Sequence, residues 1–306
     1  MEQSIQFAKL SGGGNDFICI DNRDGRYDAL IDQPDAVGHF ARSICRRGLS
    51  IGADGVIFAC SVDELGDFAD LAARHFEPNG QDAELCGNGA ACFTRWATDN
   101  GWVPRKEVKI LTTAGVVRGN RIDNDYVRVC IPLPEDIQTN FQITAAGRTW
   151  DCDFAVTGVP HVVTFVNNLE DLNIATVGPA IRYHRRFEPR GANADFAQVL
   201  DVGCLSLRTW EFGVEGETLA CGTGSAAAAI LAAKRFGWPK EYLTGQSPVL
   251  VRAHSGDVLR VYFTSHDDGT VTDVCIETFV RFAYNGTLHP ELAGEALKLQ
   301  AEANEV

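Results

Sequence analysis

Two cysteines lie in matching glycine-containing turns, and each turn precedes a stretch of helical character. The turns are Cys86-Gly87-Asn88-Gly89 and Cys221-Gly222-Thr223-Gly224. The start of a helix offers unpaired backbone N–H groups and the positive end of the helix dipole, which favour a thiolate over a thiol. A cysteine there can remove a proton near pH 7 or return one. The sequence therefore predicts two acid–base thiols, one in each half of the chain.

The glycines beside these cysteines indicate what the thiols act on. Without a Cβ, they allow a carboxylate to approach the backbone N–H groups closely. Inversion of a stereocentre needs one group to remove a proton and a second group to return it from the opposite face. The carbanion formed between the two steps places charge on the carboxylate, which two helix starts can stabilise. We therefore expect an amino-acid racemase or epimerase that acts at Cα.

An internal repeat supports a symmetric device of this kind. Four pairs of segments match in the same order, and repeats of this length indicate duplicated structural units. The sequence therefore predicts two homologous α+β domains joined near Pro132-Leu133-Pro134. The matched pairs are Gly14–Ile18 with Val159–Val163, Arg46-Arg47 with Arg185-Arg186, Gly52-Ala53-Asp54 with Gly191-Ala192-Asn193, and the two cysteine turns.

Hydrophobic periodicity places strands and helices around these motifs. Alternating or β-branched runs predict strands at Ile18–Ile20, Val56–Ala59, Val127–Ile131, Val162–Val166, Leu205–Trp210 and Val258–Phe263. Helices are predicted over Ala90–Asp99 and Ser225–Phe236, the second from its alanines. Each conspicuous cysteine is thus expected at the start of a helix.

Composition excludes several classes of protein. A formal charge of −14 argues against nucleic-acid binding, which needs clustered cationic surface. The N-terminus lacks the features of a secretion signal, and Ala226–Ala233, the longest apolar stretch, is too short to span a membrane. We expect a cytoplasmic protein without membrane partners. Its ten cysteines are then expected to be reduced, mostly as small buried side chains, without a disulfide framework.

Other uses of the cysteine turns fit less well. Gly87-Asn88-Gly89 lacks the third glycine and the acidic partner of a dinucleotide site. Cys86 and Cys92 are not spaced as a zinc pair, and the sequence contains no Cys-x-x-Cys redox motif.

The chain resembles the diaminopimelate epimerase family over nearly its whole length, up to about His289. The motifs that carry the resemblance are Gly14-Asn15-Asp16-Phe17, Gly52-Ala53-Asp54-Gly55, Cys86-Gly87-Asn88-Gly89, Pro160-His161, Ala192-Asn193 and Gly216–Gly224. The resemblance implies two pseudo-symmetric domains, each a curved, mostly antiparallel sheet around a central helix, with the active site in the cleft between them. It also implies an isomerase without pyridoxal phosphate or metal, and a homodimer.

In that fold the last strands return to the first domain. We therefore expect an N-terminal domain of residues 1–131, completed by about 279–289, and a C-terminal domain of residues 132–278. Residues 290–306 are expected to form a polar tail.

The resemblance also assigns roles to individual residues. It implies that the catalytic side chains are Cys86, Cys221, His161 and Glu211. It implies that the substrate-binding residues are Asn15, Glu77, Gly87, Asn88, Asn193, Phe212, Gly222 and Thr223. Of these, Gly87-Asn88 and Gly222-Thr223 are expected to hold the reacting carboxylate through backbone N–H groups.

Two departures from the family concern the far end of the substrate. Glu77 stands where the family usually has a substrate-binding Asn, and Phe212 stands where it has an Arg that meets the distal carboxylate. Val159 in place of an Asn is less diagnostic. Loss of that Arg removes a strong charge-assisted contact. Unless another basic residue has moved in, diaminopimelate is expected to be a poor substrate.

Three alternatives to a diaminopimelate epimerase therefore stay open. The first is a racemase of another amino acid with a neutral or cationic side chain. The second is a non-catalytic binding protein on the same fold. The third is a relative of the phenazine-biosynthesis isomerases or proline racemases. The cysteine pair argues against the binding protein and the phenazine relatives, and the motifs around it fit proline racemases less well.

Overall fold

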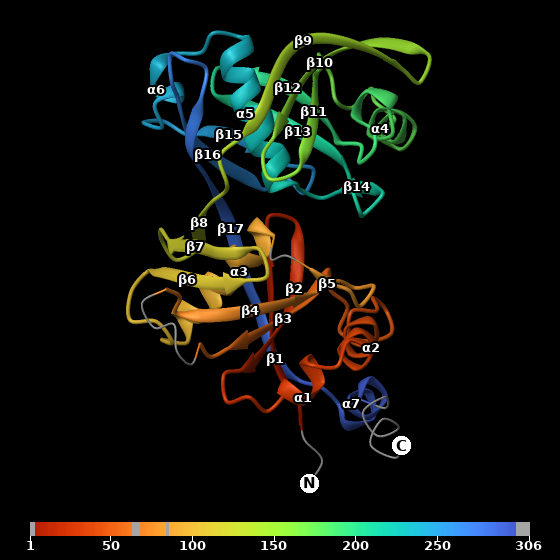
Figure 1. Cartoon of the computed structure of the whole chain (residues 1–306), viewed down its shortest axis with the longest axis vertical. Coiled ribbons are helices and arrows are strands. Elements are labelled where there is room, and N and C mark those ends of the chain that lie inside the picture. Colours follow the sequence, from red (N-terminus) through yellow and green to blue (C-terminus); the bar gives the residue numbers. More distant parts are fainter. Residues whose placement is uncertain (1–3, 63–67, 84–85, 298–306) are drawn as a thin grey trace. The chain divides into compact units, whose positions relative to one another are not determined.

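The computed structural model describes residues 4–62, 68–83 and 86–297, and the chain divides into two compact units (Figure 1). Unit 1 comprises Met1–Val127 and Val280–Val306, and unit 2 comprises Arg128–Phe279. The chain passes from one unit to the other within β8 (Tyr126–Cys130) and within β17 (Val271–Thr287), which pair with each other. The division therefore falls inside two strands rather than at the proline-rich segment that follows β8.

Unit 1 is a mixed sheet with helices packed on it. β1 runs antiparallel to β2, β2 parallel to β3, β3 antiparallel to β4, β4 parallel to β6, and β6 antiparallel to β7. The strands are β1 (Gln6–Gly12), β2 (Asn15–Asn22), β3 (Gly55–Cys60), β4 (Leu71–Phe76), β5 (Asp82–Ala83), β6 (Glu107–Thr112) and β7 (Gly115–Arg121). The helices are α1 (Asp28–Ile31), α2 (Pro34–Ile44), α3 (Gly87–Asp99) and α7 (Pro290–Ala296).

Unit 2 repeats this plan. β10 runs antiparallel to β11, β11 parallel to β12, β12 antiparallel to β13, β13 parallel to β15, and β15 antiparallel to β16. The strands are β9 (Glu135–Ala145), β10 (Arg148–Val156), β11 (Pro160–Phe165), β12 (Asn193–Asp201), β13 (Cys204–Glu211), β14 (Gly216–Thr218), β15 (Val249–Arg252) and β16 (Val258–Ser265). The helices are α4 (Ile174–Arg182), a short 3-10 turn at Arg185–Phe187, α5 (Gly222–Arg235) and α6 (Lys240–Leu243).

The strand pairings confirm the repeat but shift it by one residue. Phe17 on β2 lies opposite Gly55 on β3, and His161 on β11 lies opposite Asn193 on β12. The next residues, Ile18 and Val162, pack into the cores of α2 and α4, so Phe17 is equivalent to His161 rather than to Val162. All six predicted strands and both predicted helices are present. Each sheet is more mixed than expected, because it contains two parallel strand pairs. The two strands of each parallel pair are linked by a connection that contains a helix.

Alternation along the strands sorts unit 2 into two cores. In β11, Val162 packs into the core that includes Trp150, whereas Val163 packs into the core around α5. In β12, Phe196 belongs to the first core and Ala197 to the second. Successive residues of a strand point to opposite faces. Residues of the Val163 and Ala197 parity therefore face α5.

Helix α5 is enclosed by unit 2 because its residues are small and apolar. Ala226–Ala233 are all fully buried. A helix that is apolar all round is buried on every side. In unit 1, α3 approaches β7 so closely that a Cβ on Gly119 would lie 1.8 Å from Oγ1 of the buried Thr94. Close packing holds both helix starts at defined positions in their own units.

The expectation of a polar tail from Pro290 is wrong for its first part. Helix α7 packs against α2, and its Ala293 and Ala296 are buried in the same core as Phe40. Residues 298–306 lie outside the described residues. Among the described residues, the helices are all too short or too polar to cross a membrane.

We expect Gly119→Ala to destabilise the protein by about 1–3 kcal/mol, because its Cβ would overlap Thr94 on α3. Gly294→Ala in α7 is the control, because the added Cβ meets no atom within 4 Å. This change should raise the free energy of unfolding by about 0.5–1 kcal/mol. Urea unfolding of the two variants measures both effects. Equal stabilities would contradict the close contact between α3 and β7.

Candidate active site

Both cysteine turns form the same helix cap. Cys86 is the N-cap of α3 and Cys221 the N-cap of α5, each with an extended backbone. The two sulfurs accept hydrogen bonds from Gly89 N at 3.3 Å and Gly224 N at 3.4 Å. The N–H groups of the first helical residues point out of a helix start without intrahelical partners, so each cap can bind a carboxylate beside a thiol.

The two thiols differ in their surroundings. Cys86 is exposed, whereas Cys221 is buried. Burial raises the pKa of the Cys221 thiol well above its ordinary value, and the carboxylates of Glu211 and Asp195 raise it further. Hydrogen bonds from Thr223 and Gly224 lower this pKa, but less. The expectation that the helix start brings this thiol towards neutrality is therefore wrong for the structure as it stands, because desolvation outweighs the helix field.

A hydrogen-bonded chain connects Cys221 to a buried histidine. Cys221 Sγ lies 3.5 Å from Thr223 Oγ1, which lies 3.0 Å from His161 Nε2. His161 Nδ1 lies 2.7 Å from Asp195 Oδ2, and Thr209 Oγ1 donates to Asp195 Oδ1 at 2.7 Å. All these polar groups lie on the α5 face of unit 2. The chain can carry a proton between the thiol and the imidazole.

Strand parity explains why these side chains meet. His161 precedes Val162 on β11, and Asp195 lies between Ala194 and Phe196 on β12, so both have the parity that faces α5. The carboxylate of Asp195 can only accept, so the contact at 2.7 Å orients the imidazole with Nδ1 towards Asp195 and Nε2 towards Thr223. Asp195 was not predicted as a site residue, although its spacing of two from Asn193 on a strand is a signal that could have found it.

Asn193 links His161 to the turn after β13. Its Oδ1 accepts from Phe212 N, and its Nδ2 lies 3.4 Å from His161 Nε2. The Asn193 amide carries two N–H groups and at most one can donate to Nε2, so the other remains for a substrate. This geometry is compatible with the role predicted for Asn193.

The cap of α3 is held by amides instead of a histidine. Asn88 Nδ2 donates to Gly13 O at 3.1 Å and to Asn15 Oδ1 at 2.8 Å. Asn15 Nδ2 donates to Asp54 Oδ2 at 3.3 Å. The Asn88 side chain thus fixes the turn between β1 and β2 beside Cys86, while its backbone N–H lies in the first turn of α3.

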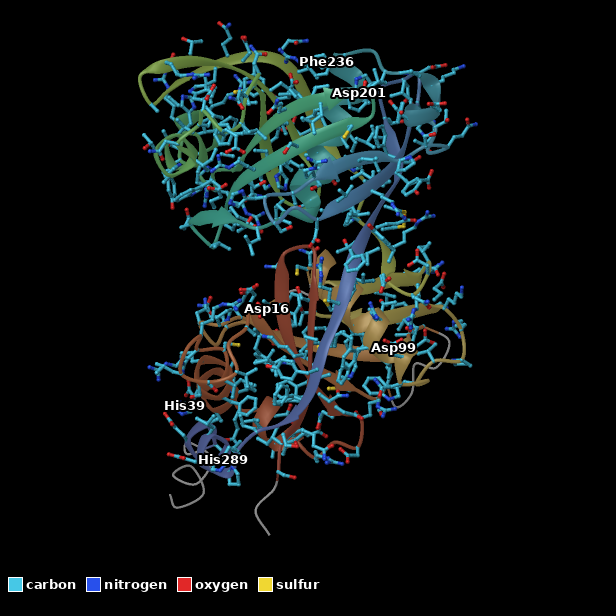
Figure 2. All side chains as sticks on the ribbon, turned by 180° about the vertical axis from the view of Figure 1, so that it is seen from behind. Asp16, His39, Asp99, Asp201, Phe236 and His289 are labelled. Atoms are coloured by element: carbon cyan, nitrogen blue, oxygen red, sulfur yellow. A yellow bond between two sulfur atoms is a disulfide. The ribbon has the colours of Figure 1, made fainter. Side chains whose placement is uncertain are left out.

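Charged side chains form a network that reaches this cap through the hydrogen bond between Asn15 and Asp54. Lys9 Nζ lies 2.7 Å from Asp16, and Arg47 pairs with both Asp16 and Asp54. Burial raises the pKa of Asp16, but the hydrogen bonds from Arg47 and Lys9 outweigh it and leave the pKa lowered. Asp16, near the start of β2, is labelled in Figure 2. Asp16 has the parity of Ile18, which faces the α2 core, whereas His161 has the parity that faces α5, so the two caps are supported by different chemistry from different faces.

The two residues that depart from the family lie in different units. Glu77 is half-buried in unit 1, in a turn closed by Gly80 N donating to Glu77 O. Phe212 in unit 2 is 36% exposed. The guanidinium carbons of Arg182 and Arg190 lie 4.3 and 5.2 Å from the centre of its ring. Two basic residues therefore lie beside Phe212, so the condition under which diaminopimelate is expected to be a poor substrate is not met.

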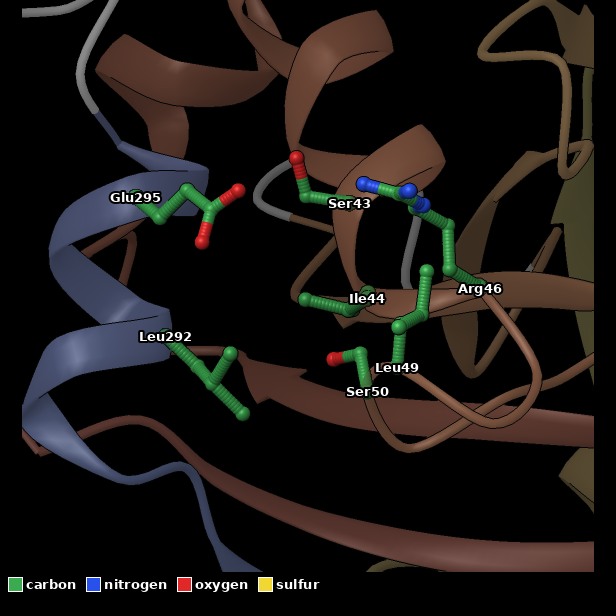
Figure 3. A pocket seen from close by; sticks show the side chains of 7 residues that line it. All are labelled: Ser43, Ile44, Arg46, Leu49, Ser50, Leu292 and Glu295. Carbon is green, nitrogen blue, oxygen red and sulfur yellow. The ribbon is translucent and has the colours of Figure 1, made fainter.

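Two cavities lie away from the cysteines. One of about 320 Å³ in unit 2 has Phe154, Pro160 and Arg190 among its lining residues. The other, of about 210 Å³, lies between α2, the loop after it and α7 (Figure 3), where Leu292 and Glu295 face Ile44 and Leu49. Neither cavity is lined by Cys86 or Cys221. Among the described residues, acidic, histidine and cysteine side chains form no cluster suited to a metal ion.

One pair of cysteines departs from the expected reduced state. Cys130 on β8 and Cys275 on β17 form a disulfide, and the other eight cysteines are free. The two residues lie 145 positions apart in the sequence, so only the pairing of β8 with β17 brings them together.

Comparison with known proteins identifies the family. The family model for diaminopimelate epimerase matches residues 7–129 and 154–272, one segment in each unit. A diaminopimelate epimerase of Aquifex aeolicus is 36% identical over 265 residues, which cover 85% of this chain and 90% of the relative. A diaminopimelate epimerase of Chlorobaculum tepidum is 34% identical over 280 residues, which cover 91% of this chain and 99% of the relative. The chain belongs to the diaminopimelate epimerase family.

Members of this family are epimerases, so the chain is an isomerase. Solved structures agree on the fold. A PhzF-family phenazine biosynthesis protein of Bacillus anthracis superposes with a TM-score of 0.70 at 13% identity, covering 94% of this chain and 99% of that one. A probable proline racemase of Agrobacterium radiobacter superposes with a TM-score of 0.66 at 15% identity, covering 93% of each chain.

The raised pKa of Cys221 leads to a test by thiol alkylation. Glu211→Gln removes a negative charge that opposes the thiolate, so the pKa of Cys221 should fall and its alkylation should begin at lower pH. Iodoacetamide labelling across a pH series, read for the Cys221 peptide by mass spectrometry, measures the profile. Glu170→Gln, an exposed change in the same unit, should leave it unchanged. An identical profile for Glu211→Gln would show that this carboxylate does not act on the thiol.

Proposed function

We propose that this chain is a cofactor-independent epimerase that inverts an amino acid at Cα with Cys86 and Cys221 as its acid and base. The observation that carries the proposal is the equivalence of the two caps. Each thiol accepts the same N–H hydrogen bond at the start of a helix, one per repeated unit. A two-base inversion needs two such groups on opposite faces of one carbon, so the proposal requires both caps to act on the same substrate.

In the proposed reaction, one sulfur takes the proton from Cα as the C–H bond breaks. The other sulfur gives its S–H proton to the opposite face as the new C–H bond forms. Charge that develops on the substrate carboxylate is stabilised by the helix-start N–H groups, such as those of Gly87-Asn88 and Gly222-Thr223. This stabilisation lets the reaction proceed without pyridoxal phosphate or a metal.

The environments of the thiols suggest their starting roles. Because burial and two carboxylates favour the protonated form of Cys221, we assign it as the proton donor for one enantiomer, with Cys86 as the acceptor. For the other enantiomer Cys221 must lose its proton. The chain through Thr223 to His161 provides a place for that proton.

We propose LL-diaminopimelate as the substrate, converted to the meso form, because the curated relatives carry that name. A racemase of an amino acid with a neutral or cationic side chain is the second candidate, and the half-buried Glu77 favours it. We further propose that the protein is a cytoplasmic homodimer, as the family resemblance implies. Light scattering on the purified protein tests the dimer.

We expect Cys86→Ala or Cys221→Ala to lower the rate of inversion at least about a thousandfold, because each variant lacks one of the two bases. The measurement is α-hydrogen exchange and change of optical rotation in deuterated water. Cys204→Ala, at a half-buried cysteine outside the caps, is the control and should keep wild-type activity. Near-wild-type turnover in either cap variant would exclude the two-base mechanism.

Substrate choice is tested by comparing kcat/KM for LL-diaminopimelate with the values for lysine, ornithine, arginine, histidine and neutral amino acids. We expect LL-diaminopimelate to be preferred, because Arg182 and Arg190 supply cations beside Phe212. A clear preference for lysine or ornithine would instead support the second candidate, with Glu77 pairing the side-chain cation.

A further inference from the structure

Two guanidinium groups share one aromatic ring at the rim of the unit 2 site. Arg182 lies over Phe212 at 4.3 Å and Arg190 at 5.2 Å. Arg182 is 3% exposed, whereas Arg190 is exposed. An aromatic face attracts a cation and holds its guanidinium plane in position. Phe212 therefore takes part in presenting positive charge rather than forming an apolar surface alone.

In the described part of the chain, one of these two guanidinium groups is ion-paired and the other is not. Arg182 Nη2 pairs with Glu215 Oε1 at 3.1 Å, and its Nε is buried without a hydrogen-bond partner among the described residues. The Arg190 guanidinium makes no ion pair within the described part of the chain. Among the described residues, Glu215 is thus the carboxylate that pairs with this arginine couple, and it pairs with Arg182. The Arg190 guanidinium is left available to an anion at the cavity that it lines together with Asp136 and Glu188.

The backbone around Arg190 is held in place. Arg182 Nη1 donates to Arg190 O at 2.9 Å, and Gly191 N donates to Phe187 O at 2.7 Å. Gly191 has φ +75°, and a Cβ there would lie 1.9 Å from Arg182 Nη1. Only glycine lets the chain pass so close to the buried guanidinium. Arg182 is thus a positioning residue, and Arg190 is the group that solvent or a ligand can reach.

This cluster adjoins the proposed acid–base residues. Phe212 N donates to Asn193 Oδ1, and Asn193 Nδ2 lies 3.4 Å from His161 Nε2. Glu211, the residue before Phe212, is close enough to raise the pKa of Cys221. A substrate whose Cα lies at Cys221 can therefore extend its side chain towards Phe212.

We propose that Arg190, held by Arg182 over the ring of Phe212, is the specificity-determining residue that binds the distal carboxylate of the amino-acid substrate. The proposal rests on the epimerase function proposed above and names the substrate class as amino acids with an anionic side-chain end. It also explains how the chain can have Phe at position 212 and still bind a dicarboxylate. The guanidinium comes from the segment before β12 rather than from the turn after β13.

The test compares Arg190→Gln with Arg186→Gln. Arg186 is an exposed arginine in the preceding turn, but it contacts Gln138 and the ring of Phe141 instead of Phe212. We expect Arg190→Gln to lower kcat/KM for LL-diaminopimelate about ten- to hundredfold, mostly through KM, because a charge-assisted contact remote from Cα is lost. Arg186→Gln should change it less than about twofold.

A second variant separates charge from structure. Adding Phe212→Arg to Arg190→Gln returns a guanidinium to the same place and should recover part of the lost kcat/KM, which a merely structural role of Arg190 would not allow. Equal effects of Arg190→Gln and Arg186→Gln would overturn the assignment of Arg190. Wild-type exchange of lysine or ornithine but not of LL-diaminopimelate would also overturn it, while leaving the two-thiol chemistry intact. Exchange with no amino acid would remove the proposed function and this inference with it.

Discussion

Unpaired N–H groups at two helix starts are the constraint on which the rest of this structure depends. A helix start must satisfy those groups from outside the helix, and here each one uses a cysteine sulfur as its cap, with small residues following it. At α5 that arrangement requires glycine, because a Cβ on Gly224 would lie 2.5 Å from Asp195 Oδ1, and both caps require a helix packed firmly enough to keep them still. In unit 2 the alanines of α5 meet this need by allowing strands to enclose the helix, and in unit 1 the close approach of β7 to α3 does so.

Duplication produced two equivalent caps whose surroundings have diverged. Cys221 is buried and connected through Thr223 to a histidine that a carboxylate orients, whereas Cys86 is exposed beside amide groups and a cationic–carboxylate network. An enzyme that interconverts two enantiomers must start from either protonation state. Under the proposed two-thiol mechanism, unequal thiols are suited to this, because one favours the protonated form while the proton of the other can exchange with solvent.

The turn after β13 shows how cations can be brought to one place from other segments of a fold. The position that usually supplies a cation carries Phe212, yet two arginines from α4 and the segment before β12 lie at its ring. A guanidinium needs to reach a location, not to come from a particular strand, and an aromatic ring can hold it there. Substitution of a binding residue in the sequence is therefore weak evidence that its charge is missing from the site.

The sequence alone determined the repeat, the strands and helices beside the cysteines, the family, and most residues now found around the caps. These follow from local signals: glycine turns, periodicity and short motifs, each carried by neighbouring residues. Tertiary structure decided the rest. Burial raised the pKa of Cys221 against the helix field, strand pairing joined Cys130 to Cys275, and parity placed Asp195 on His161. Desolvation and through-space charge depend on residues that are distant in the chain, so no local pattern reports them.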